Sequence, residues 1–163
     1  MSVLLAHRNK SRLNVLVNAD TIHDQLIELM QRNFGIRNMK HFVRVQYAYG
    51  KIESEDFSKY SFLMNSAKKR LEQNASILAN NLRTAKSIYP TNMTEYEERR
   101  KYQDLAIGNC RILLRELQRI ADIFDVNLNI YAECVKSINS EIKMITAWRQ
   151  KDNRFKSYLK GNV

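Results

Sequence analysis

Between Tyr60 and Tyr89, apolar residues recur in steps of three and four along the whole stretch. This spacing places their side chains on one stripe of an α-helix, whereas a half-buried strand would alternate at every second residue. The stripe is heptad-like, and its alanines allow a neighbouring helix to approach closely. Pro90 disfavours helical geometry at the residue before it, so the pattern predicts a long helix over residues 58–89. The stripe consists of Tyr60, Met64, Ala67, Leu71, Ala75, Leu78, Leu82, Ala85 and Tyr89.

Three other stretches have the same helical period and predict three more helices. One covers residues 13–34 and ends at Gly35, a residue type common at helix C-termini. Another covers residues 94–124 and begins with a capping box formed by Thr94 and Glu97. The last covers residues 128–149, with fraying turns as far as Leu159. Their stripes are Val15, Ala19, Ile22, Leu26, Leu29 and Met30, then Tyr102, Ala106, Cys110, Leu113, Leu117 and Phe124, and finally Tyr131, Val135, Ile138, Ile142, Ile145 and Trp148.

The chain is poor in the residues that make tight turns, with four Gly and one Pro among 163 residues. This composition favours long helices over a β-sandwich or barrel. We therefore expect an all-α fold, an antiparallel up-down four-helix bundle with an extended segment between the first two helices. Residues 1–163 should form a single domain, with a basic N-terminal arm (1–12) and a basic C-terminal tail (149–163).

Residues 36–56 carry a conflicting pattern. Val43, Val45, Tyr47 and Tyr49 alternate with other residues, which is the period of a strand. A lone strand would have no partner in a chain with no other strand pattern. We interpret the segment as a helical or irregular excursion that packs its aromatic side chains on the bundle.

The charge balance points to an anionic partner. The chain has 27 Lys and Arg against 17 Asp and Glu, a formal net charge of +10. Nucleic acid, an anionic membrane surface and an acidic protein all fit this excess, as does a basic protein with no polyanion ligand.

No apolar run approaches the roughly 20 residues that span a bilayer. The opening residues are too short and too soon charged for a signal peptide. Isolated Cys110 and Cys134 fit buried, reduced thiols in the cytoplasm.

Three arginines lie in one row on the predicted helix of residues 94–124. Arg111, Arg115 and Arg119 follow each other at four-residue steps, where like charges repel by a few tenths of a kcal/mol. Phosphate groups would offset that repulsion through bidentate hydrogen bonds. The alternative is a solvated face with intramolecular partners such as Glu116. Arg83 and Lys86 on the preceding helix are candidates to extend the same surface.

The stretch after Trp148 is a second candidate contact for nucleic acid. Its basic residues are interleaved with Phe155 and Tyr158, and aromatic rings can stack on unpaired bases while cations contact phosphates. Alternatively, Trp148, Phe155 and Tyr158 cap the bundle. Trp148, Tyr89 and Tyr102 are expected in the core or at a subunit interface. The basic residues are Arg149, Lys151, Arg154, Lys156 and Lys160.

Sequence motifs for catalysis are not recognisable. A di-metal bundle would need Glu-x-x-His pairs, and neither these nor phosphate-binding loops, nucleophile elbows or zinc spacings occur. His23 follows Asp20 by three residues, which is a weak pattern, and His23 fits a surface or interface position. We expect no catalytic site, no metal and no cofactor.

Several short runs, in this order, resemble a known family. They are the opening from Ser2 to Ala19, the run FSKYSF from Phe57, AKSIYP ending at Pro90, EYEERRKYQ from Glu95 to Gln103, and AWRQKDNR from Ala147 to Arg154. The chain thereby resembles the accessory variability determinant (Avd) proteins, four-helix-bundle accessory proteins of diversity-generating retroelements. Bundle proteins encoded by intervening sequences of bacterial large ribosomal RNA genes are related to them. The resemblance covers nearly the whole chain; residues 32–56 depart from it, being longer than the tight link expected of compact members.

The resemblance implies a non-catalytic protein that forms homopentameric barrels with basic surfaces. Such a protein binds the reverse transcriptase of the element and its RNA, and supports mutagenic cDNA synthesis. Two other functions remain open: an oligomeric helical interaction module, and a general nucleic-acid-binding protein with no reverse-transcriptase partner.

Overall fold

The computed structural model describes residues 14–160, and all regular structure in that range is helical. The expectation of an all-α fold is therefore confirmed for these residues. The predicted N-terminal arm, residues 1–12, lies outside them. The elements are α2 (Asn14–Gln31), the 3₁₀ helix η1 (Asn33–Gly35), α3 (Met39–Ala48), α4 (Phe57–Ser87), α5 (Met93–Phe124), the 3₁₀ helix η2 (Leu128–Tyr131) and α6 (Ala132–Lys160).

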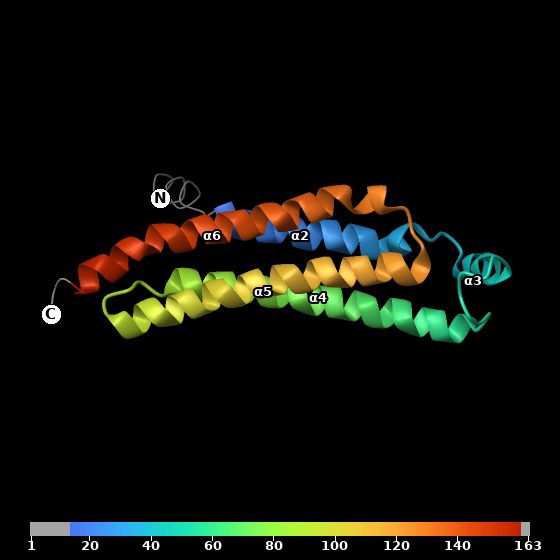
Figure 1. Cartoon of the computed structure of the whole chain (residues 1–163), viewed down its shortest axis with the longest axis horizontal. Helices are drawn as coiled ribbons and strands as arrows, with labels where there is room; N and C mark the ends of the chain where they lie inside the picture. Colours follow the sequence, from blue (N-terminus) through green and yellow to red (C-terminus); the bar gives the residue numbers. More distant parts are fainter. Residues whose placement is uncertain (1–13, 161–163) are drawn as a thin grey trace, which may run out of the picture.

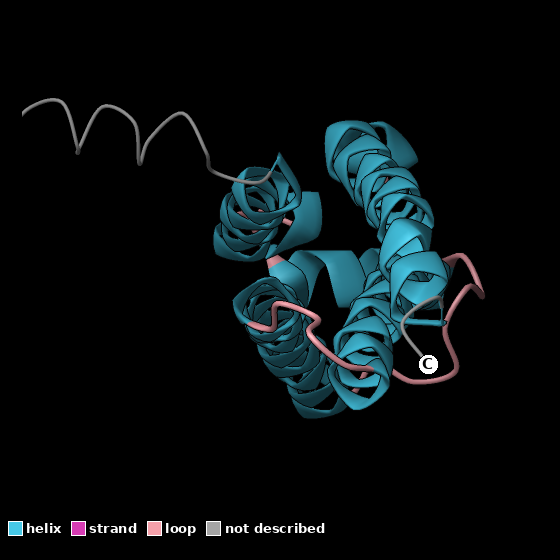
Figure 2. Cartoon of the chain, turned by 90° about the vertical axis from the view of Figure 1, so that its left-hand side faces the viewer, coloured by secondary structure: helices cyan, strands magenta, loops and turns pink. Residues whose placement is uncertain are grey.

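Four long helices lie side by side, while α3 lies at one end of them (Figures 1 and 2). Helix α4 packs against α2 and α5, and α6 packs against the same two helices. Helices α4 and α5 run in opposite directions, because Arg70 contacts Glu116 and Asn81 contacts Asn109. The apolar stripes of all four helices meet in one continuous core.

The predicted stripe of α4 is confirmed from Tyr60 to Ala85, since each of its members there is buried. Tyr89 is the exception. The helix ends at Ser87, Ile88 is already extended, and the Tyr89 side chain is 70% exposed. Pro90 disfavours helical backbone geometry at Tyr89. The helix ends before Tyr89, so the Tyr89 side chain does not continue the buried stripe. Of the two locations predicted for Tyr89, its exposure excludes the core, and the subunit interface stays a prediction.

The N-terminal cap of α5 is Asn92 and not Thr94. The Asn92 side chain accepts a hydrogen bond from the backbone amide of Glu95 at 3.0 Å. The Glu95 carboxylate in turn accepts from the amide and the hydroxyl of Thr91, at 2.8 and 2.6 Å. Both Asn and Thr can cap a helix, and Asn92 takes the role because its backbone is extended and the helix begins at Met93.

The link after α2 uses left-handed backbone. Asn33, Phe34 and Gly35 all have positive φ, and they turn the Phe34 ring into the core, where it is fully buried. A Cβ atom at Gly35 would lie 3.0 Å from Cδ1 of Ile130, so the position fits glycine on two grounds. The helix predicted over residues 13–34 is therefore shorter than expected: α2 stops at Gln31, and Gly35 ends the 3₁₀ helix η1 instead.

Residues 36–56 were expected to be either helical or irregular, and the structure shows a helix, α3, within them. Asn38 caps its start, and Val43 is buried. The Phe42 ring packs on Phe124 with centroids 6.2 Å apart. However, Tyr47 and Tyr49 are 45% and 76% exposed, so the prediction that they pack on the bundle was wrong. A single helix can bury only one face here, and Phe42 and Val43 occupy it.

Helix α6 continues well beyond Arg149. Residues 149–160 are helical, so the predicted basic tail is, over this range, the last part of a long helix. No helix among residues 14–160 is long and apolar enough to cross a membrane.

Candidate nucleic-acid interface

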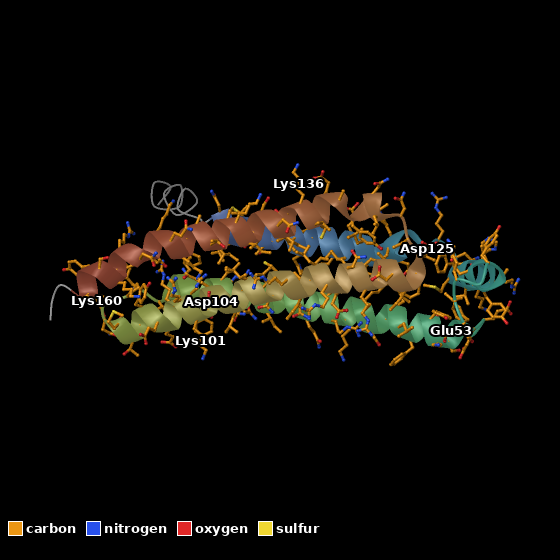
Figure 3. All side chains as sticks on the ribbon, in the orientation of Figure 1. Glu53, Lys101, Asp104, Asp125, Lys136 and Lys160 are labelled. Carbon is orange, nitrogen blue, oxygen red and sulfur yellow. The ribbon has the colours of Figure 1, made fainter. Side chains whose placement is uncertain are left out.

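Beyond its first turn, where Glu133 is exposed, helix α6 exposes basic side chains and buries its acidic ones. After Glu133, its two carboxylates are Glu141 and Asp152, which are 0% and 4% exposed. The lysines and arginine at the exposed positions make no ion pair with any residue in the range 14–160. We call this set the α6 basic surface; Lys136 and Lys160 mark its extent in Figure 3. It consists of Lys136, Lys143, Lys151, Arg154, Lys156 and Lys160.

Asp152 is neutralised inside the protein by Arg99. The guanidinium of Arg99 donates from Nε to Oδ2 at 2.7 Å and from Nη2 to Oδ1 at 3.1 Å. Gln103 donates to Oδ2 at 2.8 Å. Arg99 also lies 5.0 Å from the ring centroid of Trp148, at cation–π distance. The carboxylate therefore adds no negative charge to the surface around Lys151 and Arg154.

Glu141 lies in the core between α6 and α2. Its Oε2 accepts a hydrogen bond from Nδ2 of Asn18 at 2.7 Å. Burial raises the pKa of Glu141 to about 7, and the hydrogen bond from Asn18 opposes that shift. Burial, and then the nearby Glu141 carboxyl, raise the pKa of the Cys110 thiol to about 12. The second acidic residue of α6 is thus also withdrawn from the surface.

The three arginines of α5 form an exposed row, as predicted. Arg111, Arg115 and Arg119 are exposed and make no ion pair with any residue from 14 to 160. The suggested partner Glu116 is held by Arg70 of α4, with Nε and Oε2 2.9 Å apart. Glu116 is therefore not a partner of this row, and a solvated face stays the alternative to phosphate binding. Successive arginines are about 6 Å apart along the helix axis.

The arginine row of α5 and the α6 basic surface overlap in height along the bundle. Arg149 pairs with Asp104 at 2.8 Å, and Arg100 donates to Asn153 at 3.1 Å. These contacts fix an antiparallel register of α5 and α6, in which Arg111 is level with Lys143. The two neighbouring helices thus carry uncompensated basic side chains at the same height.

Arg83 lies elsewhere. It is 3.5 Å from Asp20 of α2 and lines a groove between α2 and α4 together with His23. Asn81 faces α5, and Arg83 is roughly 200° further around the helix, on the α2 side. The idea that Arg83 extends the arginine row was therefore wrong. Lys86 is exposed in the last turn of α4.

The residues around Trp148 divide between the two predicted roles. Trp148 is 9% exposed and belongs to the core, and Tyr102 is half-buried against that core. Phe155 packs edge-on against Tyr89, with centroids 5.6 Å apart, and so caps the bundle. Tyr158 is 69% exposed and does not. Arg149 is 26% exposed and engaged by Asp104, which leaves it less available than Lys151 or Arg154.

Sequence reasoning missed Lys136, Lys143 and the Arg99–Asp152 pair. A signal for the lysines existed: they are seven residues apart and lie opposite the apolar stripe. For Asp152 the signal was its place in the stripe, four residues after Trp148 and three before Phe155. A charged residue in a buried stripe requires a partner, but the stripe does not say which.

Among residues 14–160, no group of three or more His, Cys, Asp or Glu side chains is placed to hold a metal ion. No protein-family model, no curated protein and no solved structure matches the chain.

Proposed function

We propose that this protein binds RNA through the α6 basic surface and acts without a catalytic site of its own. The observation that carries the proposal is the burial of Glu141 and Asp152, which leaves the exposed part of α6 after Glu133 with basic charge alone. Burying carboxylates costs free energy. Exposed carboxylates would repel a phosphate chain, so burying them favours RNA binding. Solubility alone gives no reason to bury them, because exposed carboxylates also keep a protein soluble.

The last turns of α6 favour RNA over a membrane surface. Lys151, Arg154 and Tyr158 follow each other at three- and four-residue steps, so they share one face of the helix. Cations beside an exposed aromatic ring suit phosphates beside an unpaired base. A membrane-bound helix would instead expose several bulky apolar residues, and Tyr158 is the only large hydrophobic side chain that α6 exposes.

The narrower form of the proposal comes from the resemblance to the Avd proteins. We propose that the four long helices form an antiparallel up-down bundle, and that the protein assists the reverse transcriptase of a diversity-generating retroelement. A homopentamer would multiply the basic surface by repetition around an axis. The buried thiols Cys110 and Cys134 suit the reducing cytoplasm that this role requires. The ordered sequence runs are the main support for this narrower form.

The test removes charge from the α6 basic surface and compares a matched control. In the α6 variant, Lys151, Arg154 and Lys156 are replaced by Gln. The control carries the same three changes at Arg32, in the turn after α2, and at Lys59 and Lys69 of α4, all of which are exposed. A third variant changes Arg111, Arg115 and Arg119 to Gln. Affinity for a structured RNA is measured by filter binding at moderate salt.

We expect the α6 variant to bind at least about tenfold more weakly, because lost phosphate contacts no longer release counterions. The control should change little, and the α5 variant will show whether its arginine row adds to the same interface. Equal losses in the α6 variant and the control would mean that net charge alone matters. Absence of RNA binding by the unaltered protein would refute the proposal.

An interaction module is the second candidate, and one observation favours it. Ile77, Leu105 and Ile112 are 47%, 46% and 39% exposed along a groove of about 710 Å³ between α4 and α5. If this groove joins subunits, Ile112→Asp should lower the molar mass measured by light scattering and leave RNA affinity per chain unchanged. An unchanged mass would exclude the groove as a subunit contact.

A further inference from the structure

Helix α3 presents a second basic surface, at the end of the bundle away from Lys160 (Figures 1 and 3). Arg37, Lys40 and Arg44 are exposed, and no Asp or Glu occurs from residue 36 to residue 52. Tyr47 and Tyr49 are 45% and 76% exposed. The proposed contacts on α6 do not include this segment.

Part of this set shares one face of α3, while Arg37 precedes the helix and Tyr49, its C-cap, lies about 200° around from Tyr47. Lys40, Arg44 and Tyr47 follow at steps of four and three, which places them on one face. Phe42 and Val43 face the core, so the outward direction of the basic face is fixed by packing. At the C-terminus, the amide of Gly50 donates to Tyr47 O at 2.9 Å and the amide of Lys51 to Gln46 O at 2.9 Å. This Schellman motif fixes the backbone that carries Tyr49.

The nearby carboxylates form no ion pair with the cations of this surface. Asp125 is taken by Lys51. Glu53 and Glu55 are exposed in the loop that follows, yet neither forms an ion pair with any residue from 14 to 160. Arg37, Lys40 and Arg44 likewise have no carboxylate partner within the described part of the chain. Lys40 lies 5.5 Å from the ring centroid of Phe57, where it remains accessible.

We infer that the exposed surface of α3 and of its two ends binds a single-stranded segment of nucleic acid, with bases stacking on Tyr47 and on the C-cap residue Tyr49, and phosphates contacting Arg37, Lys40 and Arg44. Every base has a flat face, so two exposed rings beside three cations suit an unpaired strand without demanding a sequence. In a duplex the faces of the bases are covered, and the rings would have nothing to stack on. The inference rests on the proposed function in that it adds a site for unpaired bases to an RNA-binding protein.

The two sites are far enough apart to be tested separately. Helix α5 has 32 residues, so the long helices separate the two ends by about 48 Å. A short oligonucleotide that occupies α3 cannot reach Lys156 or Lys160. Removing the aromatic rings also leaves the net charge unchanged, which the α6 variant does not.

The experiment compares two double variants and one single variant with the unaltered full chain. Tyr47→Ala with Tyr49→Ala removes the rings, and Tyr47→Phe with Tyr49→Phe keeps them. Phe62→Ala removes an exposed ring on α4 that belongs to neither proposed site. The probes are a short unstructured single-stranded RNA, its DNA counterpart and a duplex RNA, all measured by fluorescence anisotropy. Circular dichroism checks that each variant keeps its helices.

We expect the Ala pair to bind the single strands about tenfold or more weakly, while the Phe pair and Phe62→Ala keep most of the affinity. Duplex binding should be unchanged in all three. Ultraviolet cross-links to the short strand should map to residues 37–51. Comparison of the RNA and DNA strands shows whether the 2′-hydroxyl contributes.

Four results would decide the matter. A Phe pair as weak as the Ala pair overturns stacking. Loss of affinity in the α6 variant with none in the Ala pair overturns the α3 site and leaves the proposed function intact. Loss in the Ala pair alone supports α3 and removes the α6 assignment. No effect of either set overturns both.

Discussion

A single buried carboxyl group makes the stability of this protein depend on pH. Glu141 is fully buried, and one of its oxygens has no hydrogen-bond partner. Its pKa rises from 4.5 to about 7, so the folded state favours the protonated form. Glu141 therefore contributes most to stability below about pH 4.5. That contribution is lost as the pH rises towards 7 and changes little above it.

We predict that Glu141→Gln stabilises the protein at pH 8 by up to about 3 kcal/mol and has a small effect near pH 4.5. Glutamine can still accept from Asn18 through its amide oxygen, and it carries no charge to bury. Urea unfolding of both proteins at the two pH values gives the difference, in which the other titrating groups cancel. An equal difference at both pH values would show that the burial of charge is not the cause.

The cap of α5 provides a second test at the scale of one residue. Asn92→Ala should cost about 1 kcal/mol, because the amide of Glu95 loses its acceptor. Thr94→Ala is the matched control, since Thr94 is exposed within the first turn; its effect should be within about 0.5 kcal/mol. Thermal unfolding followed by circular dichroism measures both. A larger effect at Thr94 than at Asn92 would contradict the assigned cap.

Residue positions were predictable from sequence where burial has a period. The stripe from Tyr60 to Ala85 needed only the helical repeat, because each buried member lies three or four residues from the next. The cap was misplaced by two residues, since Asn92 and Thr94 are both able to cap. Tyr89 was misplaced because a periodic pattern does not show at which residue a helix stops.

At the scale of the element, one ion pair explains why α6 does not end at Trp148. Asp152 continues the buried stripe of α6 after Trp148, and Arg99 of α5 neutralises it there. Arg99 also donates to the carbonyl of Ile88 at 2.8 Å, which ties the link between α4 and α5 to the same point. The basic residues that follow are thereby presented on a rigid helix.

We predict that Asp152→Ala destabilises the protein by about 3–5 kcal/mol, because it leaves the Arg99 guanidinium buried without a counter-charge. Hydrogen exchange of the amides of residues 149–160 should become faster. The control is Glu28→Ala, which breaks an exposed i,i+4 pair with Arg32 and should cost no more than about 0.5 kcal/mol. Unchanged exchange at the end of α6 would show that the pair does not hold it.

Contacts between residues far apart in the sequence could not be predicted from the hydrophobic pattern. Arg99 and Asp152 are 53 residues apart, and neither position alone identifies the other. In residues 36–56, the alternation of Val43, Val45, Tyr47 and Tyr49 imitates a strand, although α3 buries Phe42 and Val43 on its inner face. A short segment has too few turns for its period to reveal this. The long helices were identified because they repeat the signal several times.

At the scale of the whole molecule, the charge is arranged along the length of the bundle. The α6 basic surface overlaps in height with the arginine row of α5, and α3 adds a basic and aromatic face at the far end. The row was predictable because Arg111, Arg115 and Arg119 are close in sequence. The α6 basic surface was only partly predictable, since it depends on the burial of Glu141 and Asp152, which tertiary packing decides.

The central claim is that the α6 basic surface contacts phosphates, and the salt dependence of RNA binding tests it most directly. Each phosphate contact to a single strand contributes about −0.7 to the slope of log affinity against log salt concentration. Replacing Lys151, Arg154 and Lys156 by Gln should therefore make the slope shallower by about 2. The same three changes at Arg32, Lys59 and Lys69 should leave it as it is. A slope in the α6 variant equal to that of the unaltered protein would contradict the account.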